Sequence, residues 1–343
     1  MKRLLALVAA AAMIVGALYV RDGVGGRGGG VLAESEALRL ICVTELQAVC
    51  EALRADDDDV EISVQEAGLT AAELVQEQPS ADGWLTLQPW PEIVEEARRR
   101  EGLPPLMSDV SAIGRSPLVL VVQEDRYAVL EATCSGGFSW RCVGGQAGRP
   151  WSEIGGEATW GPVRPGVADP ERNATGLLVL GHAASGFFGR ADFSTRDFDS
   201  PFATWLGDLK RAVPSAVSST ATPLKQMLQR RGAYDLVGTT EAEAGHELAR
   251  AAPDRREGLT VVYLEPVAVA EVVLAPLAPE AHDRLAELME EGGGEALAQN
   301  GWRVEGQPTA SGVDPDLQLP ANTNIPNGGV LEALRRRWGE ITR

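Results

Sequence analysis

Ser-Pro-Leu-Val-Leu-Val-Val at Ser116–Val122 and Leu-Thr-Val-Val-Tyr-Leu at Leu259–Leu264 are the two stretches that decide the fold of this chain. Each is a short continuous apolar run, which is typical of a strand buried on both faces. Residues 119–257 lie between them and have a wound pattern of their own. A block entered and left through adjacent strands forms a separate lobe on a double hinge. The sequence therefore predicts an α/β protein with two wound α/β lobes, a double-stranded hinge and a cleft between the lobes.

The rest of the chain alternates between short apolar runs and helical patterns, as expected for wound α/β lobes. Further strands are predicted at Leu38–Val43, Val60–Val64, Gly83–Gln88 and Leu236–Thr240. Helices are predicted at Leu46–Arg54, Leu69–Gln76, Glu92–Arg100, Ala174–Phe187, Glu241–Ala251, Pro279–Glu291 and Gly328–Trp338. Residues 131–166 are rich in glycine and tryptophan, and we expect mainly loops there. This organisation assigns residues 37–118 and 258–343 to lobe I and residues 119–257 to lobe II.

The first 36 residues carry a targeting pattern. Lys2 and Arg3 precede an apolar run from Leu4 to Val20, and a glycine-rich tract follows at Gly25–Gly30. This pattern predicts export, with residues 1–36 acting as a signal peptide or as an N-terminal membrane anchor with a glycine-rich linker. The protein is therefore expected outside the cytoplasm, either secreted or anchored to the outer face of the cell membrane by residues 4–20.

Four cysteines fit an exported protein, because an even number in that compartment indicates disulfides. Cys42 lies close to Cys50 in the sequence, and Cys134 lies close to Cys142. This spacing favours two local bridges, of which the second would close its own turn.

The charge of the chain limits its partners. Its formal net charge is −18. A surface this negative repels nucleic acid and anionic lipid headgroups. We therefore expect no nucleic-acid partner, and contact with the membrane only through the N-terminal segment.

Sequence motifs of common enzymes are absent. The chain has no His-Glu-x-x-His, no P-loop and no Gly-x-Gly-x-x-Gly after a strand, and Gly181–Gly186 fails the spacing of a serine-hydrolase elbow. The three histidines, His182, His246 and His282, show no metal-ligand spacing, and no Cys-x-x-Cys occurs. We predict no catalytic residues, no metal and no cofactor, and hence a protein that is not an enzyme.

Five segments carry a resemblance to a known family: Ile113–Leu120, Val167–Gly176, Gly238–Glu241, Leu259–Pro266 and Gly294–Arg303. In this order and spacing they resemble a type II periplasmic substrate-binding protein, of the branch that contains molybdate-binding and related extracellular solute-binding proteins. The resemblance covers nearly all of residues 37–338. It implies two α/β lobes that close on a small-molecule solute, often for delivery to an ABC permease.

The same resemblance places the ligand at strand ends and helix starts facing the cleft. The matching positions are Thr44, Glu45, Trp90, Ser116, Asn173, Ala174, Thr175, Thr239, Thr240 and Tyr263. Physical chemistry supports such positions, since hydroxyls and unpaired N–H groups at a helix start bind oxyanions. Thr175 and Thr240 equally fit simple helix caps, Trp90 fits a packed loop residue, and Ser116 fits the start of a strand.

Two carboxylates depart from the pattern of members that bind tetrahedral oxyanions, which offer small hydroxyl residues after the first strand. This chain has Glu45 there, and Glu241 beside the threonines of lobe II. Carboxylates in the cleft would repel molybdate or sulfate. Either these side chains point away from the cleft, or the ligand is cationic, zwitterionic or neutral.

Two further functions compete with transport. A membrane-anchored interaction or sensory module on the same fold would explain both the long apolar N-terminal run and the acidic positions near the cleft. An exported hydrolase is less favoured, because no pair of carboxylates is placed in one cleft by the sequence.

Overall fold

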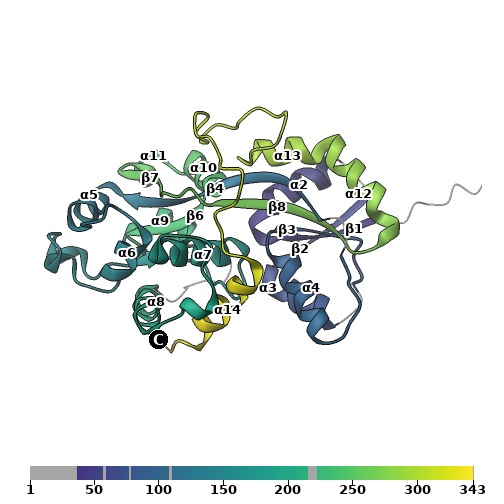
Figure 1. Ribbon diagram of the computed structural model, residues 1–343. Helices are drawn as coiled ribbons and strands as arrows, with labels where there is room; N and C mark the ends of the chain where they lie inside the picture. Colours follow the sequence, from purple (N-terminus) through teal and green to yellow (C-terminus); the bar gives the residue numbers. More distant parts are fainter. Residues whose placement is uncertain (1–36, 57–58, 77–78, 108–109, 215–221, 343) are drawn as a thin grey trace, which may run out of the picture. The chain divides into compact units, whose positions relative to one another are not determined.

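The computed structural model describes residues 37–342 of the protein, except 57–58, 77–78, 108–109 and 215–221 (Figure 1). The elements described below all belong to one compact unit, Leu38–Arg343. The predicted targeting segment, residues 1–36, lies outside the described residues, so its role stays a prediction. Within the described ranges, no helix is both long and apolar enough to cross a membrane.

Hydrogen bonds join the strands in the order β2-β1-β3-β8-β4-β6-β5, and β7 pairs with β4 outside this path. The strands are β1 (Leu38–Val43), β2 (Val60–Gln65), β3 (Gly83–Leu87), β4 (Ser111–Gln123), β5 (Pro165–Gly166), β6 (Leu236–Thr240), β7 (Leu259–Tyr263) and β8 (Val269–Pro276). Strands β1, β2 and β3 run parallel, whereas β8 is antiparallel to both β3 and β4.

The long strand β4 belongs to two sheets (Figure 1). Its first part, Ser111–Pro117, pairs with β8 and completes sheet A, which also contains β1, β2 and β3. Its second part, Leu118–Gln123, lies between β6 and β7 in sheet B, which also contains β5. The two lobes are built on these two sheets, and β4 passes from one lobe to the other.

The helices gather around the two sheets (Figure 1). Around sheet A lie α2 (Gln47–Asp56), α3 (Ala67–Gln76), α4 (Trp90–Arg100), α12 (His282–Leu288) and α13 (Gly294–Gln299). Around sheet B lie α5 (Glu124–Thr133), α6 (Trp140–Gln146), α7 (Ala174–Phe188), α8 (Ser200–Ala212), α9 (Pro223–Gln229), α10 (Glu241–Arg250) and α11 (Pro253–Arg256). The last helix, α14 (Gly328–Glu340), contacts α7 and α8 as well as α4.

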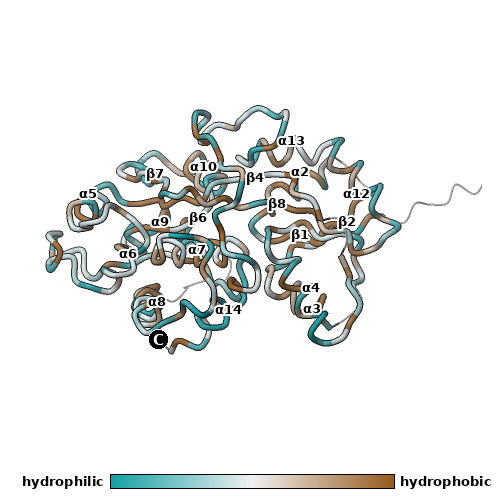
Figure 2. The backbone as a smooth tube through the Cα atoms, viewed as in Figure 1, coloured by the Kyte–Doolittle hydropathy of each residue, from teal (hydrophilic) through white to brown (hydrophobic). Residues whose placement is uncertain are grey.

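Strand β4 confirms the prediction made from its apolar run. Leu118, Leu120 and Val122 are buried in one hydrophobic cluster, and Val119 and Val121 are buried in a second cluster. Successive side chains of a strand point to opposite faces, so this alternation means that both faces of the strand are covered. Figure 2 shows the hydrophobic residues concentrated along the strands.

Strand β7 corrects the second prediction. All five of its residues, Leu259–Tyr263, are only partly buried. The strand pairs with β4 alone, so one of its edges has no neighbouring strand. The expectation of a strand buried on both faces was therefore wrong at this position.

Three chain segments lie side by side where the sheets meet. The backbone N–H of Leu118 in β4 donates to the carbonyl of Ala268, at 2.7 Å, on the segment that links β7 to β8. The N–H of Val269 donates to the carbonyl of Thr323, at 2.8 Å, on the segment between α13 and α14. The predicted crossing at Leu118 is part of the hinge, whereas the second crossing lies at Ala268, after the predicted segment near 261, and residues 303–327 supply a third. The predicted lobe boundaries at 118 and 258 stay predictions.

The structure contains both predicted disulfides, Cys42–Cys50 and Cys134–Cys142. The Cα atoms are 6.6 Å apart in the first pair and 5.7 Å apart in the second, within the usual range for a bridge. The first bridge ties the end of β1 to α2, and the second joins the end of α5 to α6.

Reduction of these bridges is expected to destabilise the protein. Each closes a short loop, and the chain-entropy relation gives about 2–3 kcal/mol for a loop of this size. The measurement is the melting temperature with and without reducing agent, compared with the double variant Cys134→Ser/Cys142→Ser. A titration that found four free thiols in the native protein would contradict both bridges.

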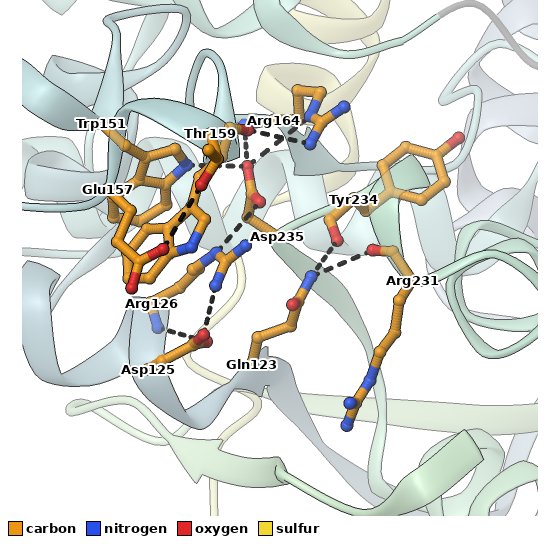
Figure 3. Close-up of polar contacts among 11 residues, drawn as sticks. Gln123, Asp125, Arg126, Trp151, Glu157, Thr159, Arg164, Arg231, Tyr234 and Asp235 are labelled. Atoms are coloured by element: carbon orange, nitrogen blue, oxygen red, sulfur yellow. Dashed lines mark hydrogen bonds and ion pairs between the residues drawn. The ribbon is translucent and has the colours of Figure 1, made fainter. Parts of the chain in front are cut away.

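A buried carboxylate anchors the loop region that precedes β5 (Figure 3). Asp235, which is fully buried, accepts hydrogen bonds from the N–H of Arg164 at 2.7 Å and from Trp151 Nε1 at 3.2 Å. Its carboxylate also lies 3.6 Å from Arg126 Nε and 3.8 Å from Arg164 Nε. The Arg126 guanidinium lies over the Trp160 ring at 3.6 Å. The glycine- and tryptophan-rich segment is therefore held to α5 and β6 by one acidic side chain.

Candidate functional site

A cavity of about 930 Å³ lies between elements of the two sheets. From the side of sheet A it is lined by the turn after β1, by α2, by the end of β2 and by α3. From the side of sheet B it is lined by residues 167–173 and by parts of α7, α9 and α10, and Trp302 and Trp338 complete it. Its position between elements of the two sheets makes this cavity the candidate ligand site.

Five of the ten predicted ligand positions line this cavity. They are Thr44, Glu45, Asn173, Thr175 and Thr240. Thr44 and Glu45 follow β1, whereas Asn173 and Thr175 stand at the start of α7 and Thr240 at the start of α10. The structure therefore brings strand ends and helix starts together around the cavity. Glu45 and Ala174, for example, are 129 residues apart in the sequence.

Glu45 reaches across the cavity to the N-terminus of α7. Its Oε1 atom accepts hydrogen bonds from the backbone N–H groups of Ala174 and Thr175, the latter at 3.3 Å. The Thr44 hydroxyl donates to Oε2 at 3.0 Å. Burial raises the pKa of the Glu45 carboxyl, and these hydrogen bonds partly oppose that shift. A carboxylate of the protein thus occupies the anion-binding position that the sequence predicted for a ligand.

Asn173 caps the same helix. Its side-chain Oδ1 accepts the N–H of Gly176 at 2.7 Å. The predicted capping of α7 is therefore made by Asn173, while the hydroxyl-bearing residue Thr175 offers its backbone N–H to Glu45.

At the start of α10, side chains of the protein likewise accept hydrogen bonds from the backbone N–H groups. Thr240 accepts the N–H of Glu243 at 3.1 Å, so its capping role is confirmed. The buried Ser116 hydroxyl accepts the N–H of Ala242 at 3.0 Å. Ser116 holds the helix rather than lining the cavity.

Thr239 and Tyr263 also lie outside the lining of the cavity and bind carboxylates. The Thr239 hydroxyl donates to Glu243 Oε2, and the Tyr263 hydroxyl donates to Glu241 Oε1 at 2.6 Å. Partial burial raises the pKa of Tyr263, and the hydrogen bond to Glu241 raises it further.

Glu241 points away from the cavity. The sequence left open whether the Glu45 and Glu241 carboxylates face the cleft, and this observation answers the question for Glu241. It is buried, and it pairs with Arg303, whose Nη2 lies 2.9 Å from Oε2. The backbone N–H of Asp314 donates to Oε1 at 2.9 Å. Its charge is compensated on the side of the third hinge segment, not in the cleft.

Trp90 lines a second, smaller cavity of about 430 Å³ between α3, α4 and the start of α14. The indole is buried, and the Arg335 guanidinium lies 5.9 Å from the ring centroid. Trp90 is thus a packed residue at the start of α4, separate from the cleft of the other predicted residues.

Two contacts that the sequence did not predict also join the lobes. The Arg172 side chain pairs with Glu66 at 2.5 Å, and the N–H of Gly68 donates to the carbonyl of Arg172 at 3.1 Å. A Cβ atom at position 68 would overlap the carbonyl oxygen of Glu171. Glu66 directly follows β2, so the rule that ligands lie at strand ends could have identified it.

No metal centre is present in the described part of the chain, where no group of three or more His, Cys, Asp or Glu residues could hold an ion. Of the histidines, His246 lines the cleft and His282 is exposed on α12. His182 is buried in α7, and this burial lowers its pKa to about 4.

Stability is expected to fall as the pH is lowered from about 6.5 to about 4, because the unfolded chain binds a proton on His182 in this window and the folded chain does not. The shift from 6.5 to about 4 corresponds to about 3 kcal/mol. Denaturant unfolding across this pH range should show a shallower decline for His182→Leu than for the wild type. His282→Leu, which removes an exposed imidazole, is the matched control. Equal slopes for the His182 variant and the wild type would refute the assignment.

Comparisons with known proteins identify the fold. No protein-family model matches the sequence, and no curated relative matches it. Solved structures do match. The periplasmic binding protein AfuA of Actinobacillus pleuropneumoniae, with fructose-6-phosphate bound, has a TM-score of 0.60 at 13% identity, covering 90% of this chain and 99% of that one.

Two more structures agree with this. Iron-bound HitA of Pseudomonas aeruginosa has a TM-score of 0.54 at 16% identity and covers 88% of this chain and 99% of its own. A substrate-binding protein of an ABC transporter from Agrobacterium tumefaciens has a TM-score of 0.54 at 14% identity, covering 91% and 96%. The structural neighbours are periplasmic substrate-binding proteins, and nothing among them singles out a molybdate-binding branch. The chain therefore has the two-lobed α/β fold of type II periplasmic binding proteins.

Proposed function

We propose that this chain is an extracytoplasmic solute-binding protein that closes on a small ligand between its two lobes and delivers it to an ABC-type transporter. The observation that carries the proposal is the 930 Å³ cavity, which is lined from both sheets. Cavities of 300–1,000 Å³ are typical of small-molecule sites. In this proposal Thr44, Glu45, Asn173, Thr175 and Thr240 face the ligand, whereas Ser116, Thr239 and Tyr263 position the groups around it.

The closed arrangement of the lobes supports the proposal. Glu45, Glu66 and Gly68 from the side of sheet A contact residues 172–175 on the side of sheet B. Contacts of this kind form when lobes approach and are lost when they separate. A ligand that touches both lobes would stabilise the approach, which is how a solute-binding protein signals that it is loaded.

A binding role also fits the residues around the cavity. Among the described residues, its lining contains one histidine, His246, and neither serine nor cysteine. Of the groups that do line it, the Thr44 hydroxyl donates to Glu45, and Glu45 and Thr240 accept backbone N–H groups at helix starts. Four parts of the proposal rest on the sequence. They are the export signal, the lobe boundaries, the permease partner and the molybdate-binding-like branch.

A thermal-shift screen with oxyanions, amino acids, sugars and amines tests the function. A ligand that binds only the folded protein adds RT ln(1 + [L]/Kd) to its stability, about 2.7 kcal/mol at one hundred times Kd. At least one compound is expected to raise the melting temperature. If no class of solute did so, and residues 1–20 were found embedded in the membrane, the anchored interaction module would replace this proposal.

Gly68→Ala is expected to weaken binding of the ligand found in that screen by at least tenfold. The added Cβ would overlap the carbonyl of Glu171 only when the lobes are closed, so the open form should fold normally. Gly145→Ala is the matched control, because a Cβ there meets nothing within 4 Å. Titration calorimetry gives the affinities, and X-ray scattering should show a larger radius of gyration for the variant. Unchanged affinity would argue against closure at this contact.

A further inference from the structure

The N-terminus of α7 is equipped to bind an anion, and the protein itself supplies one. The helix has 15 residues, so its first N–H groups carry the positive end of a long helix. Asn173 accepts one of these groups, and Glu45 accepts two others. An oxyanion ligand would have to displace Glu45 from two backbone donors. The cleft is therefore already occupied at the position where an oxyanion would bind.

The lining of the cavity as a whole is more acidic than basic. Six carboxylates face four cationic side chains there: Glu45, Glu51, Glu66, Asp169, Glu243 and Glu247 against Arg172, Lys210, Lys225 and Arg250. Ion pairs within the lining join Arg172 to Glu66, and Lys225 to Glu247 at 3.4 Å. An anion entering the cleft meets a negative field, whereas a cation is attracted.

Glu243 has one carboxylate oxygen without a hydrogen-bond donor among the described residues. It lies in the first turn of α10, and its Oε2 accepts the Thr239 hydroxyl. Its other oxygen, Oε1, is buried and has no hydrogen-bond partner among the described residues. Buried carboxylate oxygens are normally satisfied, so an unsatisfied one in a ligand cavity indicates a donor on the ligand.

Aromatic side chains complete the lining. Tyr234, Trp302 and Trp338 border the same cavity. Aromatic rings bind organic cations through the negative face of the π system. The Trp338 ring already holds one ammonium group, that of Lys210 at 4.8 Å, so an aromatic side chain of this lining can bind a cation.

We propose that the cleft binds a small organic cation, with Glu45 as the specificity-determining residue that excludes oxyanions and Glu243 as the carboxylate that accepts the ligand N–H group. This inference rests on the proposed solute-binding function and names the class of solute. It also accounts for the departure at position 45, where the sequence has a carboxylate instead of a small hydroxyl residue.

Binding of defined probes tests the ligand class. Thermal shift and calorimetry are run with putrescine, agmatine and tetramethylammonium as cations, sulfate and molybdate as oxyanions, and glucose as a neutral solute. At least one cation is expected to bind, and the oxyanions and glucose are not. Stabilisation by sulfate, molybdate or glucose would overturn the inference while leaving the solute-binding function intact. Absence of binding by all three cations would overturn it as well.

Three variants test the assigned residues. Glu243→Gln is expected to lower the affinity for the cation at least tenfold. Glu287→Gln, which removes one exposed charge on α12, should leave that affinity unchanged. Glu45→Ala frees the N–H groups of Ala174 and Thr175 and is expected to gain sulfate binding that the wild type lacks. Equal effects of the Glu243 and Glu287 variants would overturn the role of Glu243. A Glu45→Ala protein that still ignored sulfate would overturn the role of Glu45.

Discussion

Replacing Asp235 with alanine is expected to lower the free energy of unfolding by about 3–5 kcal/mol, the usual cost of removing one partner from a buried ion pair. The variant removes the carboxylate beside the Arg164 and Arg126 guanidinium groups, of which Arg126 keeps Asp125, and it leaves the N–H groups of Trp151 and Arg164 without an acceptor. Asp235 is fully buried, so water cannot replace these bonds without opening the structure. Urea unfolding followed by tryptophan fluorescence gives the measurement.

Two controls separate charge from packing in this prediction. Asp235→Asn keeps the shape of the side chain and one hydrogen-bond acceptor. Its free energy of unfolding should fall by less, about 1–3 kcal/mol. Asp208→Ala removes an aspartate from an exposed pair with Arg211 on α8 and should cost at most about 1 kcal/mol. If the alanine variants at 235 and 208 unfolded at the same urea concentration, the anchoring role of Asp235 would be wrong.

Glu241→Ala is expected to have an effect of similar size, about 3–5 kcal/mol, for a different region of the molecule. The Glu241 carboxylate joins the start of α10 to Arg303, Tyr263 and the N–H of Asp314. These partners come from β7 and from the third segment of the hinge. Loss of the carboxylate should therefore loosen residues 303–327 as well as lower the overall stability, and hydrogen exchange of that segment measures the first effect.

A double-variant cycle with Arg303→Met isolates the ion pair. Because the two charges are in direct contact, the losses from the single variants should not add, and the double variant should be more stable than their sum predicts. Glu96→Ala, on the exposed face of α4, is the surface control. Additive losses at 241 and 303 would mean that the two residues act independently.

Local sequence patterns were sufficient for most of the fold. Leu38–Val43 and Leu236–Thr240 are strands with the predicted bounds, because an apolar run between polar residues fixes both ends. Strand β8, Val269–Pro276, was not predicted although its sequence is apolar. It follows β7 with only a short link and no helix, and both strands pair with the same partner, β4. A prediction that assumes a helix between successive strands therefore misses a pair such as β7 and β8.

The candidate site was predictable only where local chemistry determines it. Thr240 was found because a cap at a helix start has a sequence signature, whereas Asn173 came from the family resemblance and the predicted cap of that helix was Thr175. The contacts of Glu45 with Ala174, and of Glu66 with Arg172, join residues more than one hundred positions apart. Which way Glu241 points depends on Arg303, which arrives through the hinge. Such outcomes follow from how the lobes meet, and no short window of sequence contains that information.

The last helix carries a consequence for how the protein matures. Trp338, in α14, borders the same cavity as Thr44, and its ring lies 4.8 Å from the Lys210 ammonium group. Thr44 and Trp338 are nearly three hundred residues apart in the sequence, so a nascent chain has no complete pocket until Trp338 has been added. If the chain is exported while still extended, as proposed from residues 1–36, it would pass the solutes of the cytoplasm before its pocket could form.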